Sequence, residues 1–239
     1  MTVDVLAVGP HPDDAELGVG GTLHKIATRG FAAAILDLTE GETASRGTTG
    51  ERRTEAQNAA HCLGLAARVQ AGLPDGGVVN TPEQRRTVLM QIRALRPRML
   101  LAPSGPERHP DHTAAHGLVR DANFFAGVAG IDTGQEPYRA PTVYFYFPYY
   151  QPVRKPALVV DISEHLEAKL TALRAYVSQF HNPEYAGAKT WVASKQFWDA
   201  IVTRAAYWGE QVGVRHGEPL YADDPFGCDL PPGLSGGRE

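Results

Sequence analysis

Two short polar segments carry the side chains that could do chemistry in this chain. They read His11-Pro12-Asp13-Asp14-Ala15-Glu16 and Arg108-His109-Pro110-Asp111-His112. Two histidines and one acid, with one coordination position left open, are the ligands of many catalytic zinc sites. His11 and Asp14 are three residues apart, so one turn can point both inward, and His112 would supply the second imidazole. We therefore expect these three residues to bind Zn²⁺, or Fe²⁺ in its place.

Four further residues of these segments could act beside such a metal. Asp13 adjoins a ligand and could take a proton from water as a general base. His109, in its charged form, could stabilise an oxyanion or protonate a leaving group. Asp111 could orient His109, or it could cap the helix that follows. Glu16 is either a partner of the ligands or an acid of the first helical turn.

Both polar segments follow apolar runs that are typical of buried strands. Residues 3–8 stop at Gly9-Pro10, and residues 99–102 end before Pro103. In a parallel sheet the carboxyl ends of the strands lie at one edge, where open α/β folds place their ligands. Because both segments leave that edge, we expect them to meet.

Strands and helices alternate along the first half of the chain. In chain order, the expected elements are residues 3–8, 16–29, 31–38, 51–63, 69–73, 82–96, 99–102 and 111–125. This alternation predicts a mostly parallel sheet with helices on both faces, an α/β fold. In the second half we expect strands at 142–147 and 157–162 and helices at 164–180 and 194–212. We expect a single domain over residues 1–221 and a Pro/Gly-rich tail over residues 222–239.

Composition excludes several classes of protein. The net charge of −4 argues against a nucleic-acid partner held by bulk positive charge. The two cysteines, Cys62 and Cys228, form no CxxC pair and suit a reducing compartment. The first strand begins without a basic segment before it, and no apolar stretch reaches the roughly 18 residues of a membrane span. We expect a soluble cytoplasmic protein with no signal peptide and no membrane contact.

The two polar segments together resemble the zinc-dependent N-deacetylases of N-acetylglucosamine conjugates, the LmbE-like or PIG-L-like superfamily. The likeness covers most of the chain, and further motifs look like the bacterial branch that deacetylates N-acetylglucosaminyl-malate for bacillithiol. These motifs are Thr39-Glu40-Gly41-Glu42, Ser45-Arg46-Gly47-Thr48, Leu73-Pro74-Asp75-Gly76, Ala175-Tyr176-Val177-Ser178-Gln179-Phe180 and Gly213-Val214-Arg215-His216-Gly217-Glu218. One departure is Gly9-Pro10 before His11, where the family more often has a small residue such as Ala. It concerns the geometry of the turn and not a ligand.

The resemblance implies a Rossmann-like three-layer core and a homo-oligomer, often a hexamer. It also implies that His11, Asp14 and His112 are the metal ligands, Asp13 the base, and His109 the electrophilic or acidic partner. The expected reaction is hydrolysis of the acetamide of a small amino-sugar conjugate, with N-acetyl-α-D-glucosaminyl L-malate as the favoured substrate.

Four residues are candidates for binding the substrate, three of them arginines that could hold an anionic part of it, since a guanidinium meets a carboxylate in a forked pair. Arg46 lies in a polar loop and Arg108 adjoins His109, while Arg53 is suggested by the family likeness. Glu42, in one of the motifs above, is the fourth. Arg52 is expected to be a solvated helix residue.

Three other functions remain open. The same site could hydrolyse another amide, such as a mycothiol precursor, a chitooligosaccharide or an amidated thiol conjugate. The chain could instead be a sugar-binding protein that uses a metal only for recognition. Gly18-Val19-Gly20-Gly21 invites a third interpretation, a nucleotide-binding fold, but this pattern lacks its third glycine. Close packing of a helix on the sheet is the simpler explanation of these glycines.

Two smaller groups of residues carry alternatives of their own. His116 follows His112 by four and could share its helix face, although a surface position or one beside the ligands fits better. Four tyrosines could line a sugar pocket, while packing in a strand core explains the first two equally well. They are Tyr144, Tyr146, Tyr149 and Tyr150.

Overall fold

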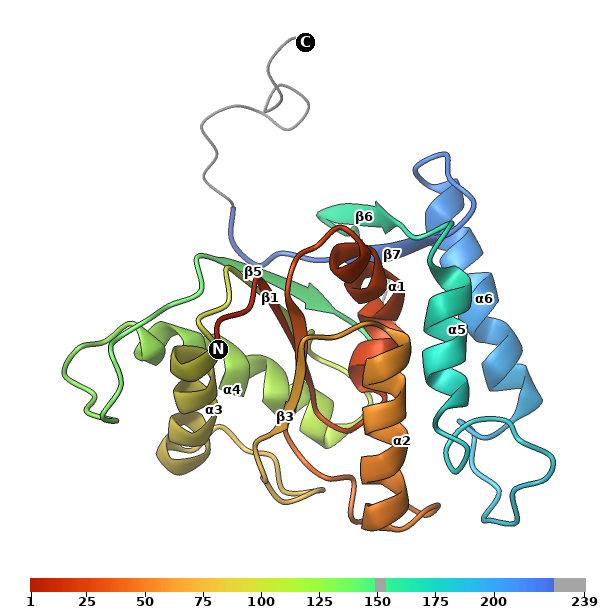
Figure 1. Ribbon diagram of the computed structural model, residues 1–239, viewed down its shortest axis with the longest axis horizontal. Helices are drawn as coiled ribbons and strands as arrows, with labels where there is room; N and C mark the ends of the chain where they lie inside the picture. Colours follow the sequence, from red (N-terminus) through yellow and green to blue (C-terminus); the bar gives the residue numbers. More distant parts are fainter. Residues whose placement is uncertain (149–153, 226–239) are drawn as a thin grey trace, which may run out of the picture.

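A parallel five-stranded sheet forms the centre of the protein. The computed structural model describes residues 1–148 and 154–225. The strands are β1 (Val5–Gly9), β2 (Ala33–Asp37), β3 (Ala67–Gln70), β4 (Met99–Pro103) and β5 (Thr142–Tyr146). Their order is β3-β2-β1-β4-β5, and every neighbouring pair is parallel (Figure 1). The predicted α/β fold is therefore confirmed.

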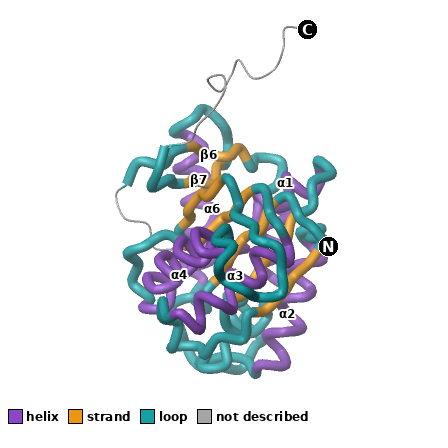
Figure 2. Tube along the Cα trace, turned by 90° about the vertical axis from the view of Figure 1, so that its left-hand side faces the viewer, coloured by secondary structure: helices purple, strands orange, loops and turns teal. Residues whose placement is uncertain are grey.

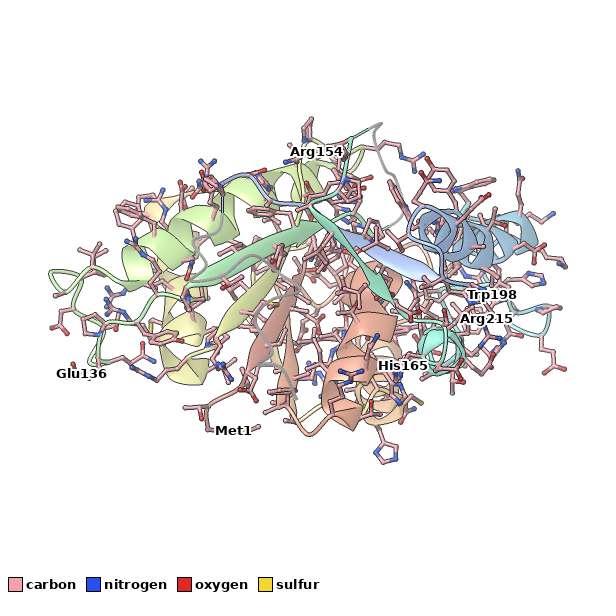
Figure 3. All side chains as sticks on the ribbon, turned by 90° about the horizontal axis from the view of Figure 1, so that it is seen from above. Met1, Glu136, Arg154, His165, Trp198 and Arg215 are labelled. Carbon is pink, nitrogen blue, oxygen red and sulfur yellow. The ribbon has the colours of Figure 1, made fainter. Side chains whose placement is uncertain are left out.

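Helices cover both faces of the sheet. They are α1 (Asp14–Thr28), α2 (Thr49–Cys62), α3 (Pro82–Leu95), α4 (Pro110–Ala126), α5 (Leu166–Arg174) and α6 (Lys195–Glu210). Helices α3 and α4 cover one face, and α1 and α2 cover the other, with α5 and α6 packed outside them (Figures 1 and 2). Figure 3 shows the two ends of this arrangement, with Glu136 beyond α3 and α4 at one end and Trp198 of α6 at the other.

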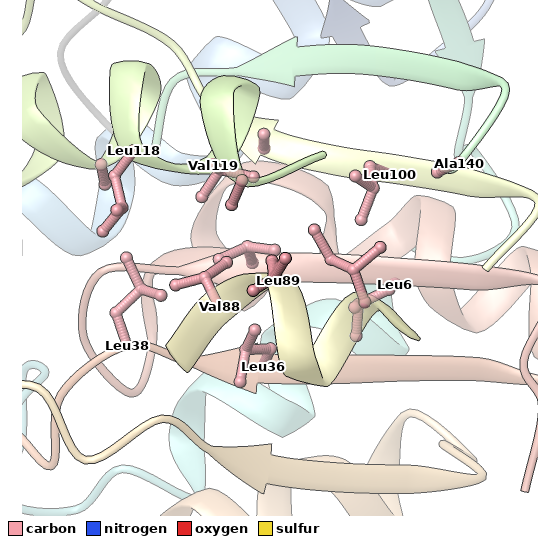
Figure 4. Packing of buried hydrophobic residues seen from close by; sticks show 14 of the residues in the cluster. Leu6, Leu36, Leu38, Val88, Leu89, Leu100, Leu118, Val119 and Ala140 are labelled. Carbon is pink, nitrogen blue, oxygen red and sulfur yellow. The ribbon is translucent and has the colours of Figure 1, made fainter. Parts of the chain in front are cut away.

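Alternate side chains of β1 face opposite layers, as strand geometry requires. Leu6 packs with Leu100 of β4 and with Val88 and Leu89 of α3 (Figure 4). Its neighbour Ala7 packs instead with the residues of α1. The strand is buried on both faces, which explains why its sequence is a continuous apolar run.

The second half of the chain departs from the expectation in two places. The helix expected over residues 164–180 spans only Leu166–Arg174, and Ser178 beyond its end gives its backbone N–H to the Glu55 carboxylate at 2.7 Å. A strand that we did not expect, β7 (Gly217–Leu220), pairs antiparallel with β6 (Leu158–Asp161) in a separate two-stranded sheet. Its sequence Gly-Glu-Pro-Leu has little β-propensity, so only its tertiary contacts reveal it.

The expected tail lies mostly outside the described residues, which end at 225. Its first residues contact the domain, because Arg154 donates hydrogen bonds to the Ala222 carbonyl and the Asp223 carboxylate. The boundary at residue 221 stays a prediction. Among the described helices, none is both long enough and apolar enough to cross a membrane.

A buried ion-pair network fixes the first turn of α1 against the sheet. Arg68 of β3 binds both carboxylate oxygens of Asp37 at 2.7 and 2.8 Å and one oxygen of Glu16 at 2.5 Å. The Tyr176 hydroxyl donates to the same Glu16 oxygen at 2.7 Å. The three charged side chains are at most 1% exposed. Glu16 therefore connects the start of α1 to the sheet, and the polar segment that precedes it is held on a rigid base.

The glycines of α1 serve packing. A Cβ on Gly18 would lie 2.0 Å from Cδ2 of the buried Tyr146 ring, and one on Gly21 would lie 2.8 Å from Ile162. The Tyr146 hydroxyl in turn donates to the Val8 carbonyl at 2.7 Å. The packing interpretation of residues 18–21 is confirmed, and Tyr146 belongs to the core. Tyr149 and Tyr150 lie outside the described residues.

Replacing Gly18 with alanine is expected to lower the free energy of unfolding by about 1–3 kcal/mol, because the new methyl group overlaps Tyr146. Gly117→Ala in α4 is the matched control, since its Cβ would meet only Asn80 at an ordinary 3.6 Å. That change should be neutral or stabilising by up to about 1 kcal/mol. Urea unfolding of both variants measures the difference, and equal stabilities would contradict the packing argument.

Replacing Arg68 with methionine is expected to cost about 3–5 kcal/mol of unfolding free energy, because Glu16 and Asp37 would remain buried without their cation. Arg174→Met is the control. Its ion pair with Glu167 has side chains 53% and 74% exposed, and such pairs contribute less than about 1 kcal/mol. Denaturant midpoints check both values, and a loss for Arg68 as small as that for Arg174 would show that the network adds no stability.

Candidate active site

The two polar segments meet at the carboxyl edge of the sheet. They follow β1 and β4, which are neighbours in the sheet and pair in register from Val5 with Met99. Helix α1 then crosses to one face and α4 to the other (Figure 1). This is the point where the strand order reverses, and in open α/β sheets a crevice for ligands forms there.

Three side chains converge there with the spacing of metal ligands. His11 Nδ1 and His112 Nε2 each lie 3.1 Å from Asp14 Oδ2 and 3.3 Å from each other. Ligands bound at about 2.1 Å around a tetrahedral ion are roughly 3.4 Å apart. The three atoms therefore fit one divalent cation. Two imidazoles and a carboxylate suit Zn²⁺ and also Fe²⁺.

The turn between β1 and α1 adopts an unusual backbone conformation. Asp13 has φ of 107°, in the left-handed region that non-glycine residues rarely adopt. Asp13 is the N-cap residue of α1, yet its side chain makes no capping hydrogen bond. Asp14 Oδ2 instead accepts a hydrogen bond from the backbone N–H of His11 at 2.9 Å. The turn thus places two successive carboxylates in different surroundings.

Charges around the ligands favour a bound cation. Burial would lower the pKa of His11, but hydrogen bonds with Asp111, Asp14 and Asp75 outweigh it and raise this pKa to about 12. Burial likewise opposes protonation of His112, while Asp14 and Glu107 raise its pKa to about 9. Burial would raise the pKa of Asp14, yet the two histidines hold it well below its usual range. An incoming metal ion must therefore displace protons from the imidazoles.

Asp13 is buried and paired with Arg52. Burial raises the pKa of Asp13 to about 7, and the Arg52 guanidinium, whose Nη2 lies 3.3 Å from Oδ2, opposes that shift. Arg52 also donates to the Pro12 carbonyl. The expectation that Arg52 is a solvated helix residue is wrong, because only 4% of it is exposed. This arginine fixes the backbone and the side chain of the residues around Asp13.

His109 is the N-cap residue of α4, and its Nδ1 accepts the backbone N–H of Asp111 at 3.2 Å. The ring proton of neutral His109 therefore sits on Nε2. Burial and the neighbouring His11 and His112 lower the pKa of His109, so the neutral ring is favoured where we expected a charged one. His109 also belongs to a second possible metal group with His11 and Asp111. That group is less suited to a metal, because in this tautomer His109 has no lone pair to spare.

Asp111 is not a helix cap, which corrects one of the two expectations for it. Its carboxylate accepts backbone hydrogen bonds from Gly76 at 2.8 Å and Val78 at 3.3 Å. One oxygen lies 3.2 Å from His11 Nε2, on the opposite side of the ring from Asp14. Its side chain contacts His11, while its contact with His109 runs through the backbone.

Sequence reasoning missed two carboxylates that contact the histidine rings. Asp75 Oδ1 lies 3.0 Å from His11 Nε2, and its other oxygen accepts from the backbone and hydroxyl of Thr43. Glu107 Oε2 lies 2.6 Å from His112 Nδ1. Asp75 belongs to the motif Leu73-Pro74-Asp75-Gly76 and follows β3 at the same sheet edge. This position could have identified it as a residue of the site. Glu107 is marked only by its position shortly before His109.

The four candidates for substrate binding occupy different surroundings. Arg46 is buried and donates from Nε to the Ser178 carbonyl at 2.5 Å and from Nη1 to the Ala188 carbonyl at 2.7 Å. Arg53 is 60% exposed and pairs with Glu40 at 2.7 Å. Glu42 is exposed and accepts the backbone N–H of Asp75 at 2.8 Å. Arg108 is exposed beside His109.

His116 lies one helical turn beyond His112 but faces away from the ligands. Its Nε2 lies 3.2 Å from Asp223, and its ring packs on Phe145 with centroids 4.6 Å apart. These contacts do not place His116 with His112 in one metal site, so the alternative of a shared ligand face is wrong.

The chain is similar to known deacetylases over most of its length. The family described as "PIG-L: GlcNAc-PI de-N-acetylase" matches residues 6–123. The diacetylchitobiose deacetylase of Thermococcus kodakarensis is 34% identical, covering 90% of this chain and 81% of the relative. A probable N-acetyl-α-D-glucosaminyl L-malate deacetylase of Bacillus anthracis is 28% identical, covering 81% of this chain and 93% of the relative. The crystal structure of the conserved protein TT1542 from Thermus thermophilus has a TM-score of 0.85 at 38% identity, covering 94% of this chain and 96% of that one.

The identity to the Thermococcus deacetylase and its coverage show the family, and the fold agrees with the solved structure over nearly the whole chain. The expected resemblance is confirmed by the family match, which includes both polar segments. The chain therefore belongs to the PIG-L family of N-deacetylases, hydrolases that cleave amide C–N bonds.

Proposed function

We propose that this protein is a metal-dependent N-deacetylase of N-acetylglucosamine conjugates, with one ion held by His11, Asp14 and His112. The observation that carries the proposal is the convergence of these three groups within 3.3 Å of one another, with a second buried carboxylate, Asp13, beside them. A bound Zn²⁺ or Fe²⁺ would supply Lewis acidity, polarising an amide carbonyl and making water more acidic.

Asp13 is proposed as the general base. It is adjacent to a ligand, and its own contact is with Arg52 at 3.3 Å. It would take a proton from water as the water attacks the acetamide carbon, and it would later give that proton to the departing amine. Arg52 would hold the Asp13 carboxylate toward the reacting atoms. Its role would be to position the base.

His109 is proposed to stabilise the oxyanion. Its Nδ1 is engaged by the Asp111 N–H, so Nε2–H is the donor that remains. A neutral imidazole can donate to a developing negative charge without itself losing a proton. The products would be acetate and the free glucosamine conjugate.

The substrate is proposed to be a short N-acetylglucosamine saccharide of the diacetylchitobiose type. The similarity to the Thermococcus deacetylase supports this choice. The surroundings of two arginines also support it, because Arg46 serves two backbone carbonyls and Arg53 pairs with Glu40. Both are thus less suited to clamping an anionic substrate.

The malate conjugate is the second candidate. It is supported by the similarity to the Bacillus deacetylase and by Arg108, which is exposed beside His109 and could meet a carboxylate. A homo-oligomeric assembly and a cytoplasmic location stay predictions.

Asp13→Asn is expected to lower the rate of acetate release by roughly 10²- to 10⁴-fold while keeping the metal, because asparagine cannot accept the proton. Asparagine also tolerates the left-handed backbone at this position. His112→Ala and a chelator should instead remove the metal and the activity together. Near-normal turnover by Asp13→Asn would contradict the assignment of Asp13 as the general base. If the unmodified protein also releases no acetate, a sugar-binding role is favoured.

Comparing two substrates separates the two candidates. We expect diacetylchitobiose to be deacetylated with the higher kcat/KM, and Arg108→Ala to leave that value unchanged. If the malate conjugate is also a substrate, the same variant should lower its kcat/KM by roughly tenfold or more, the strength of one charged hydrogen bond. Arg53→Ala is the matched control and should affect neither substrate. Faster turnover of the malate conjugate by the unmodified enzyme would reverse our choice.

A further inference from the structure

We propose that Glu107 is a positioning residue for His112, holding the imidazole in the tautomer and orientation that a metal ion requires. This inference rests on the proposed metal centre and adds to it a residue that neither the metal-ligand pattern nor the base accounts for. The geometry that carries it is a 2.6 Å contact between Glu107 Oε2 and His112 Nδ1.

The loop that carries Glu107 is fastened to the first turn of α4. The Glu107 N–H donates to Thr113 Oγ1 at 2.9 Å, and that hydroxyl donates back to the Glu107 carbonyl at 2.8 Å. The backbone N–H of His109 reaches Glu107 Oε2 at 3.4 Å. Because Thr113 is the next residue after His112, the acid and the imidazole are parts of one small rigid unit. The contact is therefore built into the local fold.

The contact determines which ring nitrogen faces the ion. A carboxylate oxygen 2.6 Å from a ring nitrogen attracts a proton and repels a lone pair, so Glu107 favours the tautomer of His112 that carries its proton on Nδ1. The lone pair of the neutral ring then lies on Nε2, which is the nitrogen 3.1 Å from Asp14 and 3.3 Å from His11. An acid behind a metal-binding histidine fixes the ring and makes it a stronger ligand.

A purely structural role would not explain a carboxylate at this position. The Glu107 side chain is 0% exposed, and within the described part of the chain its second oxygen, Oε1, finds no hydrogen-bond partner. Leaving a polar oxygen buried in this way costs free energy, which an apolar side chain would avoid. The Glu107 carboxylate is instead explained by its effect on the tautomer and orientation of the His112 ring.

Carboxylates lie behind both histidine rings. His11 Nε2 has two carboxylates within hydrogen-bond distance, Asp75 at 3.0 Å and Asp111 at 3.2 Å. Behind His112, the Glu107 carboxylate lies 2.6 Å from Nδ1. Loss of Glu107 should therefore weaken metal binding, since it removes the acid that contacts this ring nitrogen.

The test measures zinc affinity in metal-stripped protein by competition with a chromophoric chelator. Glu107→Gln preserves the size of the side chain and removes its charge, and it should weaken zinc binding roughly 10- to 100-fold. Asp121→Asn removes one charge from α4, where Asp121 contacts Asn80 at 2.8 Å and Arg120 at 3.6 Å, and should leave the affinity unchanged. At saturating zinc, the KM of Glu107→Gln for the substrate should match that of the unmodified enzyme.

The outcomes separate this inference from the proposed function. If His112→Ala loses zinc while Glu107→Gln binds it normally, Glu107 has no positioning role and the metal centre stands. If His112→Ala also binds zinc normally, the proposed metal centre itself is wrong. Should Glu107→Gln fail to fold, two-bond ¹H–¹⁵N spectra of the metal-free unmodified protein, at a pH where the His112 ring is neutral, decide. A His112 proton on Nδ1 supports the inference, and one on Nε2 overturns it.

Discussion

The parallel pairing of β1 with β4, where the strand order of the sheet reverses, is the constraint on which the other features depend. Because α1 and α4 leave this point for opposite faces, the segments between strand and helix stand side by side without a connection covering them. This arrangement brings His11 and His112 together. The Arg68 network then keeps the first turn of α1 from shifting against β2 and β3.

Electrostatics organises the site around an excess of carboxylates. Acids lie behind each histidine ring as well as beside it, and the cation nearest to Asp13 is the buried Arg52. In a region shielded from water such an excess favours any positive charge that fits between the imidazoles. Asp13 is the exception, because its contact is with an arginine and not with a ligand. The cluster thus contains two neighbouring acids in different roles. Asp14 contacts the histidines and can bind a metal ion, while Asp13 can exchange a proton.

Residue types and spacing were enough to predict the fold class and the meeting of the two polar segments. They could not show which of Arg52 and Arg53 is buried and which faces solvent. Neighbouring residues on a helix point about 100° apart, and α2 has little apolar pattern that would indicate its buried face. The surroundings of Arg46 depend on residues 178–188, which reach it only through tertiary contacts. Asp75 contacts His11 from a loop whose course no local pattern encodes. These contacts form when distant segments dock, so the sequence around each residue does not contain them.

The left-handed backbone at Asp13 ties chemistry to folding stability. A non-glycine residue in that conformation is strained by about 1–3 kcal/mol, and glycine would relieve the strain. A glycine there would make the turn easier to form and would delete the carboxylate at the same time. Folding stability therefore favours glycine at position 13, whereas turnover requires the aspartate.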